Sequence, residues 1–150
     1  MLYIKWMKRG GKRISMISAS NSGIGLHWTV PRNSPPLDAR IWNTRRNHFG
    51  WRLYLRGQAK DKVSPYAAPI HQTDYHDLPP CYTFVGEGEP FYAETLQYVK
   101  NLLAAGVPAE VDVYPTDMHA FDMLRPQDAV SKEAIQNFER HFEHALRMKL

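Results

Sequence analysis

Two short stretches, Cys81-Tyr-Thr-Phe-Val85 and Glu110-Val-Asp-Val-Tyr114, decide the fold class of this chain. The first is a run of β-branched and aromatic residues that ends at Gly86, which is typical of a buried strand. The second alternates polar and apolar residues, which predicts a strand with one solvent-exposed face at or near the edge of a sheet. We therefore expect a sheet with at least these two strands in the second half of the chain.

Helical patterns follow each of these strands. Apolar residues recur on one helical face after the first strand, and the pattern ends at Gly106 and Pro108. This face consists of Tyr92, Leu96, Val99, Leu102 and Leu103. The last segment repeats apolar residues every three or four positions, at Val130, Ala134, Phe138, Phe142 and Ala145. The order strand–helix–strand–helix predicts an open α/β fold with a mostly parallel sheet, in which ligands bind at the carboxyl ends of the strands.

The first half has weaker patterns. Residues 2–7 are predicted as the end of a helix, and Arg13–Ile17 as a strand that leads into a turn of small residues over 18–23. Residues 42–57 are aromatic and basic, and we expect them to be helical in part, with the aromatic residues in the core or lining a pocket.

Length and composition limit the class of protein. The 150 residues suffice for one domain, and a hydrophobic fraction of 43% excludes general disorder. No apolar run approaches the roughly 20 residues that span a bilayer, so no membrane partner is expected. The first residues lack the pattern of a signal peptide, which favours a cytoplasmic protein, and Cys81 alone allows neither a disulfide nor a cysteine metal site.

The net charge of +4 hides an uneven distribution. Residues 1–60 hold twelve Lys and Arg residues and one acid, a balance of +11, whereas residues 61–150 hold seven and fourteen, a balance of −7. A basic half indicates either nucleic-acid binding or a fragment whose acidic neighbours are absent. We favour the second interpretation, and nucleic acid is not the expected partner.

Ionisable residues follow both predicted strands. Glu87 and Glu89 come after the first strand, and His119 comes after the second, 30 residues beyond Glu89. A carboxylate that orients a histidine, which then acts as general base, is the second half of a nucleophile–histidine–acid triad. In α/β-hydrolases the triad residues follow the chain order Ser, acid, His, and the order here fits.

Several motifs together resemble one known family. They are Ser64-Pro-Tyr-Ala-Ala-Pro69, Leu78-Pro-Pro80, Val85-Gly-Glu-Gly-Glu-Pro90, Leu103-Ala-Ala-Gly-Val-Pro108, Tyr114-Pro115 and His119-Ala-Phe121. In this order and spacing they resemble the α/β-hydrolase fold-3 family, the hormone-sensitive-lipase-like esterases that include acetyl esterases. The resemblance runs from about Pro36 to Leu146. It implies the C-terminal portion of a three-layer α/β-hydrolase fold.

The resemblance also implies roles for single residues. His119 matches the triad histidine, and Glu89 matches the triad acid, which is usually Asp followed by Pro in this family. Ser20, in Ser18-Ala-Ser20-Asn-Ser22, matches the nucleophile of the family's Gly-x-Ser-x-Gly elbow, and the backbone N–H of Asn21 matches an oxyanion donor. The implied activity is the hydrolysis of short-chain carboxylic esters through an acyl-enzyme, without metal or cofactor and with a small-molecule ester as substrate.

The sequence departs from the family's pattern in the elbow and upstream of it. Both elbow glycines are serines here, and only 69 residues separate Ser20 from Glu89, a shortfall that falls within 24–35. The family's His-Gly-Gly-Gly oxyanion loop lies upstream of the elbow, before this chain begins. We therefore expect one truncated domain, with a degenerate elbow region over 1–35 and a well-matched part over 36–150, that is a poor esterase and self-associates through an exposed sheet edge.

Other interpretations remain open for the same residues. Glu89 also suits the N-cap of the following helix, Glu87 competes for the role of acid, and Asp117 is expected to be a loop residue. Ser20 can equally be an ordinary turn serine, and His141 with His144 is expected to form a solvated face rather than a metal site. For the whole chain, the alternatives are a non-catalytic remnant or binding module of the same fold, and a basic nucleic-acid-binding fragment.

Overall fold

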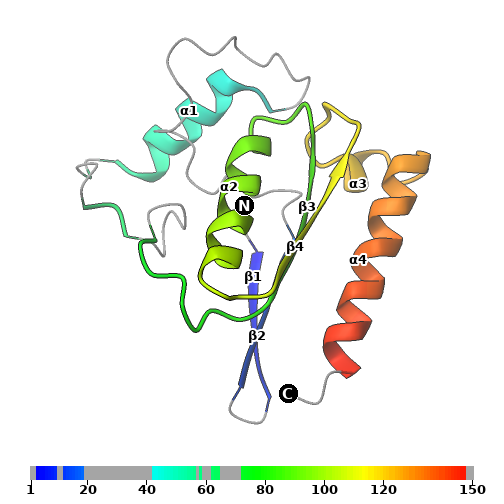
Figure 1. Cartoon of the computed structure of the whole chain (residues 1–150). Helices are drawn as coiled ribbons and strands as arrows, with labels where there is room; N and C mark the ends of the chain where they lie inside the picture. Colours follow the sequence, from blue (N-terminus) through cyan, green and yellow to red (C-terminus); the bar gives the residue numbers. More distant parts are fainter. Residues whose placement is uncertain are drawn as a thin grey trace.

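The described part of the chain comprises residues 3–9, 12–18, 42–56, 58, 62–64 and 72–147 of a computed structural model. Its elements, in chain order, are four strands and four helices, drawn in Figure 1. They are β1 (Tyr3–Arg9), β2 (Lys12–Ser18), α1 (Thr44–Tyr54), β3 (Cys81–Gly86), α2 (Tyr92–Ala104), β4 (Ala109–Tyr114), α3 (Phe121–Leu124) and α4 (Ala129–Arg147). The expected α/β class is confirmed.

The two strands that the sequence predicts most clearly form a parallel pair. Cys81 lies opposite Ala109 and Gly86 opposite Tyr114, and α2 makes the crossover between the strands. Every residue of β3 is buried, because helices cover both faces of this strand. β4 is only partly buried and carries no further strand partner within the described ranges, which fits the expected edge strand.

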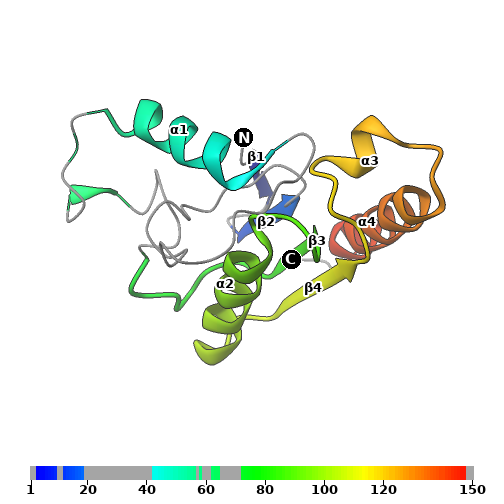
Figure 2. The same cartoon turned by 90° about the horizontal axis from the view of Figure 1, so that it is seen from above.

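Alternate residues of β3 pack on opposite helices. Cys81 contacts the buried face of α2 through Tyr98 and Leu102, whereas Tyr82 and Phe84 pack toward Ala134 and Phe138 of α4. Figure 2 shows α2 and α4 on opposite sides of the β3–β4 pair. This three-layer arrangement fixes the carboxyl ends of both strands relative to one another.

The helix boundaries follow local signals in the sequence. Asn43 caps α1 by accepting a hydrogen bond from the backbone N–H of Arg46 at 3.0 Å. The expected end of α2 at Gly106 is confirmed, since this residue has φ of 77° and lies just beyond the helix. The expected apolar face of α2 is partly wrong, because Leu103 is 55% exposed while Thr95 and Tyr98 are buried.

The prediction of a helix end over residues 2–7 is wrong. Residues Tyr3–Arg9 form β1, which pairs antiparallel with β2 so that Arg9 lies opposite Lys12. Gly10-Gly11 separates the two runs in the sequence, and such a pair is a common two-residue hairpin signal. The strand expected over Arg13–Ile17 is confirmed as β2, which lies next to β3.

Candidate active site

The site is built from the two loops at the carboxyl ends of β3 and β4. The backbone N–H of Glu87 donates to the carbonyl of Tyr114 at 2.9 Å, and that of Gly88 donates to the carbonyl of Thr116 at 3.1 Å. These bonds extend the parallel ladder beyond the last paired residues, so the loops leave the sheet side by side. Any side chains that point from one loop toward the other are therefore held at short range.

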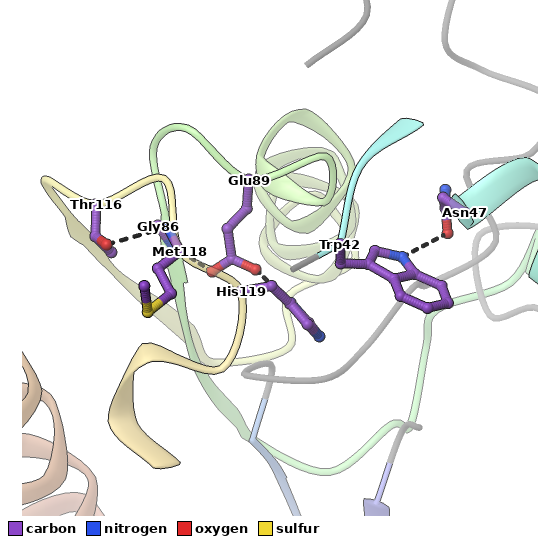
Figure 3. A network of polar contacts seen from close by, with 7 residues as sticks. All are labelled: Trp42, Asn47, Gly86, Glu89, Thr116, Met118 and His119. Atoms are coloured by element: carbon purple, nitrogen blue, oxygen red, sulfur yellow. Dashed lines mark hydrogen bonds and ion pairs between the residues drawn. The ribbon is translucent and has the colours of Figure 1, made fainter. Parts of the chain in front are cut away.

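Glu89 is a buried carboxylate with a partner for each oxygen. Its side chain is 0% exposed, and Oε1 accepts a hydrogen bond from the backbone N–H of Gly86 at 3.0 Å. Oε2 lies 2.7 Å from Nδ1 of His119, as Figure 3 shows. A buried carboxylate is stable only when it is hydrogen-bonded in this way, and the two contacts fix its orientation.

His119 is oriented by this carboxylate. With Nδ1–H donating to Glu89, the neutral ring carries its lone pair on Nε2, at the end directed away from the acid. The His119 side chain is 10% exposed. The turn that presents it has Ala120 at φ 58°, and the N–H of Met118 donates to Oγ1 of Thr116. The arrangement suits a general base whose tautomer is set by the acid.

Two glycines allow the loops to approach this closely. A Cβ on Gly86 would lie 2.5 Å from the carbonyl oxygen of Thr116, and a Cβ on Gly88 would lie 2.7 Å from Cβ of Asp117. Neither distance is compatible with a side chain. Both glycines belong to a motif named in the sequence analysis, which assigned them no role. The sequence feature that could have indicated this close approach is the Gly-Glu-Gly-Glu order at the end of a predicted strand.

Two aromatic rings flank His119, and sequence reasoning did not assign either to the site. The ring of Phe91 meets the imidazole edge to face at 5.1 Å between centroids, and the indole of Trp42 lies tilted at 6.3 Å. Phe91 follows Glu89 on the same loop, whereas Trp42 precedes α1 and lies far away in the sequence. The hydrogen bond from Trp42 Nε1 to Oδ1 of Asn47 at 3.3 Å holds the indole.

The competing roles for the acidic residues can be compared directly. Glu89 does not cap α2, because the helix begins at Tyr92 after Phe91 and its cap has no side-chain hydrogen bond. Glu87 and Asp117 are exposed and neither contacts His119 within the described loops, so Glu89 is the carboxylate that the fold brings to the histidine.

The other two predicted site residues, Ser20 and Asn21, lie outside the described residues. The strand that precedes them is described, and β2 ends at Ser18, two positions before Ser20. The sequence therefore puts Ser20 shortly after a strand, which is where the elbow of an α/β-hydrolase stands.

A family model described as the alpha/beta hydrolase fold matches residues 4–123. The chain belongs to the α/β-hydrolase fold family. The matched segment includes both strand-end loops, so Glu89 and His119 lie within it. The expected kinship with the fold-3 esterases is confirmed by this match and by the proteins that the chain resembles.

These similar proteins are esterases, and the chain corresponds to a part of each. The acetyl esterase of Salmonella dublin is 29% identical over 91 residues, which are 61% of this chain and 28% of that protein. The crystal structure of esterase LipW from Mycobacterium marinum is 30% identical, with a TM-score of 0.67 over 71% of this chain and 33% of that one. A bacterial heroin esterase is 31% identical, with a TM-score of 0.64 over 69% and 33%. The chain thus spans about a third of the length of these relatives.

Two further features were predicted away from the site. His141 is not a free surface residue, since its ring stacks on Tyr82 at 3.9 Å and Nε2 lies 3.6 Å from Oε1 of Glu110. His144 is exposed. In the part of the chain that the structure describes, no helix has the length and apolar character needed to cross a membrane.

Proposed function

We propose that this chain is a carboxylic ester hydrolase for short acyl groups that uses Ser20, His119 and Glu89 in an acyl-enzyme mechanism. The observation that carries the proposal is the buried contact of 2.7 Å between Glu89 Oε2 and His119 Nδ1 at the carboxyl ends of adjacent parallel strands. The membership in the α/β-hydrolase family and the similarity to acetyl esterases support the choice of ester substrates.

Each residue has a defined step in this mechanism. The hydroxyl oxygen of Ser20 attacks the ester carbonyl while Nε2 of His119 accepts the hydroxyl proton. The backbone N–H of Asn21 donates to the resulting oxyanion. His119 then carries the proton on Nε2, and Glu89 stabilises the imidazolium through Oε2. The C–O bond to the alcohol breaks, the electron pair stays on the alcohol oxygen, and Nε2–H returns the proton to it. Water then attacks the acyl-enzyme in the same way, and the carboxylic acid is released.

We propose in addition that the rate is low for this family. The elbow is a strained turn in which the flanking residues must carry little or no side chain, and both flanking positions are serines, Ser18 and Ser22. If this is correct, the double change Ser18→Gly and Ser22→Gly increases kcat. An unchanged or lower kcat in the double variant contradicts this part of the proposal.

The test is the hydrolysis of a chromogenic acetate ester by the purified chain, beside Ser20→Ala, His119→Ala and Glu89→Gln. The proposal expects turnover that each of the three changes abolishes or greatly reduces. Asp117→Asn is the matched control, because this exposed carboxyl lies on the same loop as His119 and makes no contact with it in the described structure. Turnover that survives Ser20→Ala places the nucleophile elsewhere, and turnover that survives His119→Ala refutes the mechanism.

A non-catalytic binding module of the same fold is the second candidate. The substitution of both elbow glycines favours it, because the acid and the histidine remain in place while the nucleophile turn has changed. This candidate predicts no ester turnover by the wild-type chain or by the double glycine variant, together with a folded Glu89–His119 pair. Turnover that depends on Ser20 excludes it.

The basic half and the strand edges raise two smaller proposals. We propose that the +11 charge of residues 1–60 does not support specific nucleic-acid binding. We also propose that the chain self-associates through a sheet edge, since each described sheet has only two strands. A micromolar shift of DNA at about 0.15 M salt contradicts the first. Sedimentation of a monomer at tens of micromolar contradicts the second.

A further inference from the structure

Trp42 is fixed beside the catalytic-site histidine by α1. Its indole N–H donates to Oδ1 of the buried Asn47, and its six-membered ring lies over Gly50, where an added Cβ would come within 3.4 Å of it. Both contacts lie along the Nε1 edge of the indole and restrict its rotation. A ring held in this way presents a fixed surface rather than one that must be ordered when a ligand binds.

The residues around His119 differ in how much of them a ligand can reach. The Glu89 side chain is 0% exposed and Phe91 is 2% exposed, so a ligand from solvent cannot reach either of them. His119 retains an exposed edge, and Trp42 is half-buried. In Figure 3 the free end of the imidazole points away from Glu89, toward the side on which Trp42 lies. A molecule that reaches Nε2 therefore lies on the side of the imidazole on which the indole stands.

We propose that Trp42 forms the aromatic wall of the subsite for the leaving alcohol and makes the site selective for esters of arylmethyl alcohols. This inference rests on the proposed ester hydrolysis. The leaving oxygen must come within hydrogen-bond reach of Nε2, because His119 returns a proton to it. The group attached to that oxygen is thus held next to the imidazole, and the indole centroid lies 6.3 Å from the imidazole centroid. The acyl group faces the nucleophile and the oxyanion donor instead.

The expected preference is modest because only one ring supplies it. An aromatic pair in offset or edge-to-face geometry is favoured over an aliphatic contact of the same area, by an amount that corresponds to roughly two- to tenfold in kcat/KM. The selectivity should appear mainly in KM, since the indole contacts the alcohol group rather than the reacting carbonyl.

Benzyl acetate and cyclohexylmethyl acetate form a suitable pair of substrates. The two alcohols have the same number of carbons and leave with similar ease, so the comparison isolates the aromatic ring. The wild-type chain is expected to prefer benzyl acetate by roughly two- to tenfold in kcat/KM. Trp42→Leu should bring the ratio close to one, and Trp42→Phe should keep most of it. An equal kcat/KM for the two esters in the wild type, or a preference that persists in Trp42→Leu, overturns the assignment.

A second measurement separates this inference from the proposed function. The imidazole resonances of His119 are followed by NMR during titration with benzyl alcohol and, in parallel, with cyclohexylmethanol, with His119→Ala used to identify them. Stronger binding of benzyl alcohol that Trp42→Leu removes supports the subsite even when no ester is hydrolysed, which is the outcome in which only the proposed function fails. Turnover with no preference and no selective shift refutes the subsite while the proposed function stands.

Discussion

Two carboxylates at the β3–β4 pair have contrasting surroundings, and Glu89 is buried whereas Asp112 is half-buried. Glu89 binds Gly86 with one oxygen and His119 with the other, and the second ring nitrogen of His119 has no partner in the part of the chain that the structure describes. Asp112 lies on β4 in a group that we call the α4 cluster, which consists of Tyr82, Asp112, Tyr114, Asn137 and His141. There a single oxygen, Oδ2, accepts from Tyr82 at 2.7 Å and from Tyr114 and Asn137 at 3.3 Å each.

The difference lies in what remains available after the internal contacts are made. In the α4 cluster the donors are used within the fold, because Asn137 also donates to the hydroxyl of Tyr114 at 2.9 Å and His141 stacks on Tyr82. These contacts tie α4 to both strands. At the strand ends, Glu89 contacts Gly86 and His119, and Nε2 of His119 has no partner among the described residues. One carboxylate is therefore suited to hold a helix and the other to support chemistry.

The largest expected effect that tests this comparison is on catalysis. Glu89→Gln should lower kcat for a short-chain ester by about 10²–10⁴-fold, because the glutamine amide donates to Nδ1 and forces the proton of the neutral ring onto Nε2. His119→Ala should produce a loss of similar size. The measurement is steady-state hydrolysis of a chromogenic acetate.

The matched change in the α4 cluster is Asp112→Asn, which likewise replaces a carboxylate by its amide, here a half-buried one. We expect kcat to stay within about threefold of the wild type, since Asp112 does not contact the strand-end loops. If this variant loses as much activity as Glu89→Gln, the two carboxylates do not have separate tasks and the comparison is wrong.

The next effect is on stability and concerns the close approach of the two loops. Gly86→Ala and Gly88→Ala should each lower the free energy of unfolding by about 1–3 kcal/mol, because the new Cβ meets backbone or Cβ atoms of Thr116 and Asp117 below 3 Å. Both should also reduce activity by displacing His119. Gly106→Ala is the control, since no atom lies within 4 Å of its added Cβ and only the φ of 77° opposes it. Urea denaturation of the three variants distinguishes steric displacement from backbone strain.

The pair Glu89–His119 could be predicted from the sequence because it depends on local signals. Each residue follows a short strand that is recognisable by composition, and the carboxyl ends of parallel strands share one edge of the sheet. The resemblance to the family supplied the roles. The same reasoning identified β3, α2, β4 and α4 with errors only at individual positions such as Leu103.

The remaining features depend on how distant segments are placed. Trp42 reaches His119 because the segment before α1 packs against Val85 and Phe91, and nothing in the sequence near residue 42 specifies that position. The α4 cluster escapes sequence reasoning for a similar reason, since the alternating pattern predicts a solvent-exposed Asp112, whereas Asn137 of α4 donates a hydrogen bond to it. The hairpin of β1 and β2 did have a local signal in Gly10-Gly11, and the interpretation of 2–7 as helical overlooked it.

A smaller effect is expected when a contact of the α4 cluster is removed. Asp112→Asn should lower the free energy of unfolding by about 1–3 kcal/mol, because two phenolic hydroxyls lose a charged acceptor. Tyr82→Phe removes one of those donors and should cost about half as much. Denaturant unfolding that monitors α4, for example by the exchange of its amide hydrogens, should show this helix opening first. Equal stability of Asp112→Asn and the wild type would mean that the cluster does not hold α4.

The smallest predicted effect is the dependence of stability on alkaline pH. Burial, and then the hydrogen bond to Asp112, raise the pKa of Tyr82, and burial raises the pKa of Tyr98 on the α2 side to about 12. A phenol with a raised pKa in the folded state resists ionisation there, so its contribution to stability is complete below the unfolded value of 10.0 and is lost as the pH rises toward the folded value. Each such group therefore lowers the free energy of unfolding by at most about 1.4 kcal/mol per pH unit above pH 10. Burial of Cys81, whose pKa is raised from 9.0 to about 12, adds a similar loss of stability that begins one pH unit lower.

Urea denaturation between pH 8 and 11 should give a shallower decline of stability for Tyr82→Phe and for Tyr98→Phe than for the wild type, and the comparison of the two variants divides the loss between the two sides of the sheet. A Tyr82→Phe chain that declines as steeply as the wild type would show that the Tyr82 hydroxyl ionises as freely in the folded chain as in the unfolded one, and the α4 cluster would then lack the buried character that separates it from the open side of His119.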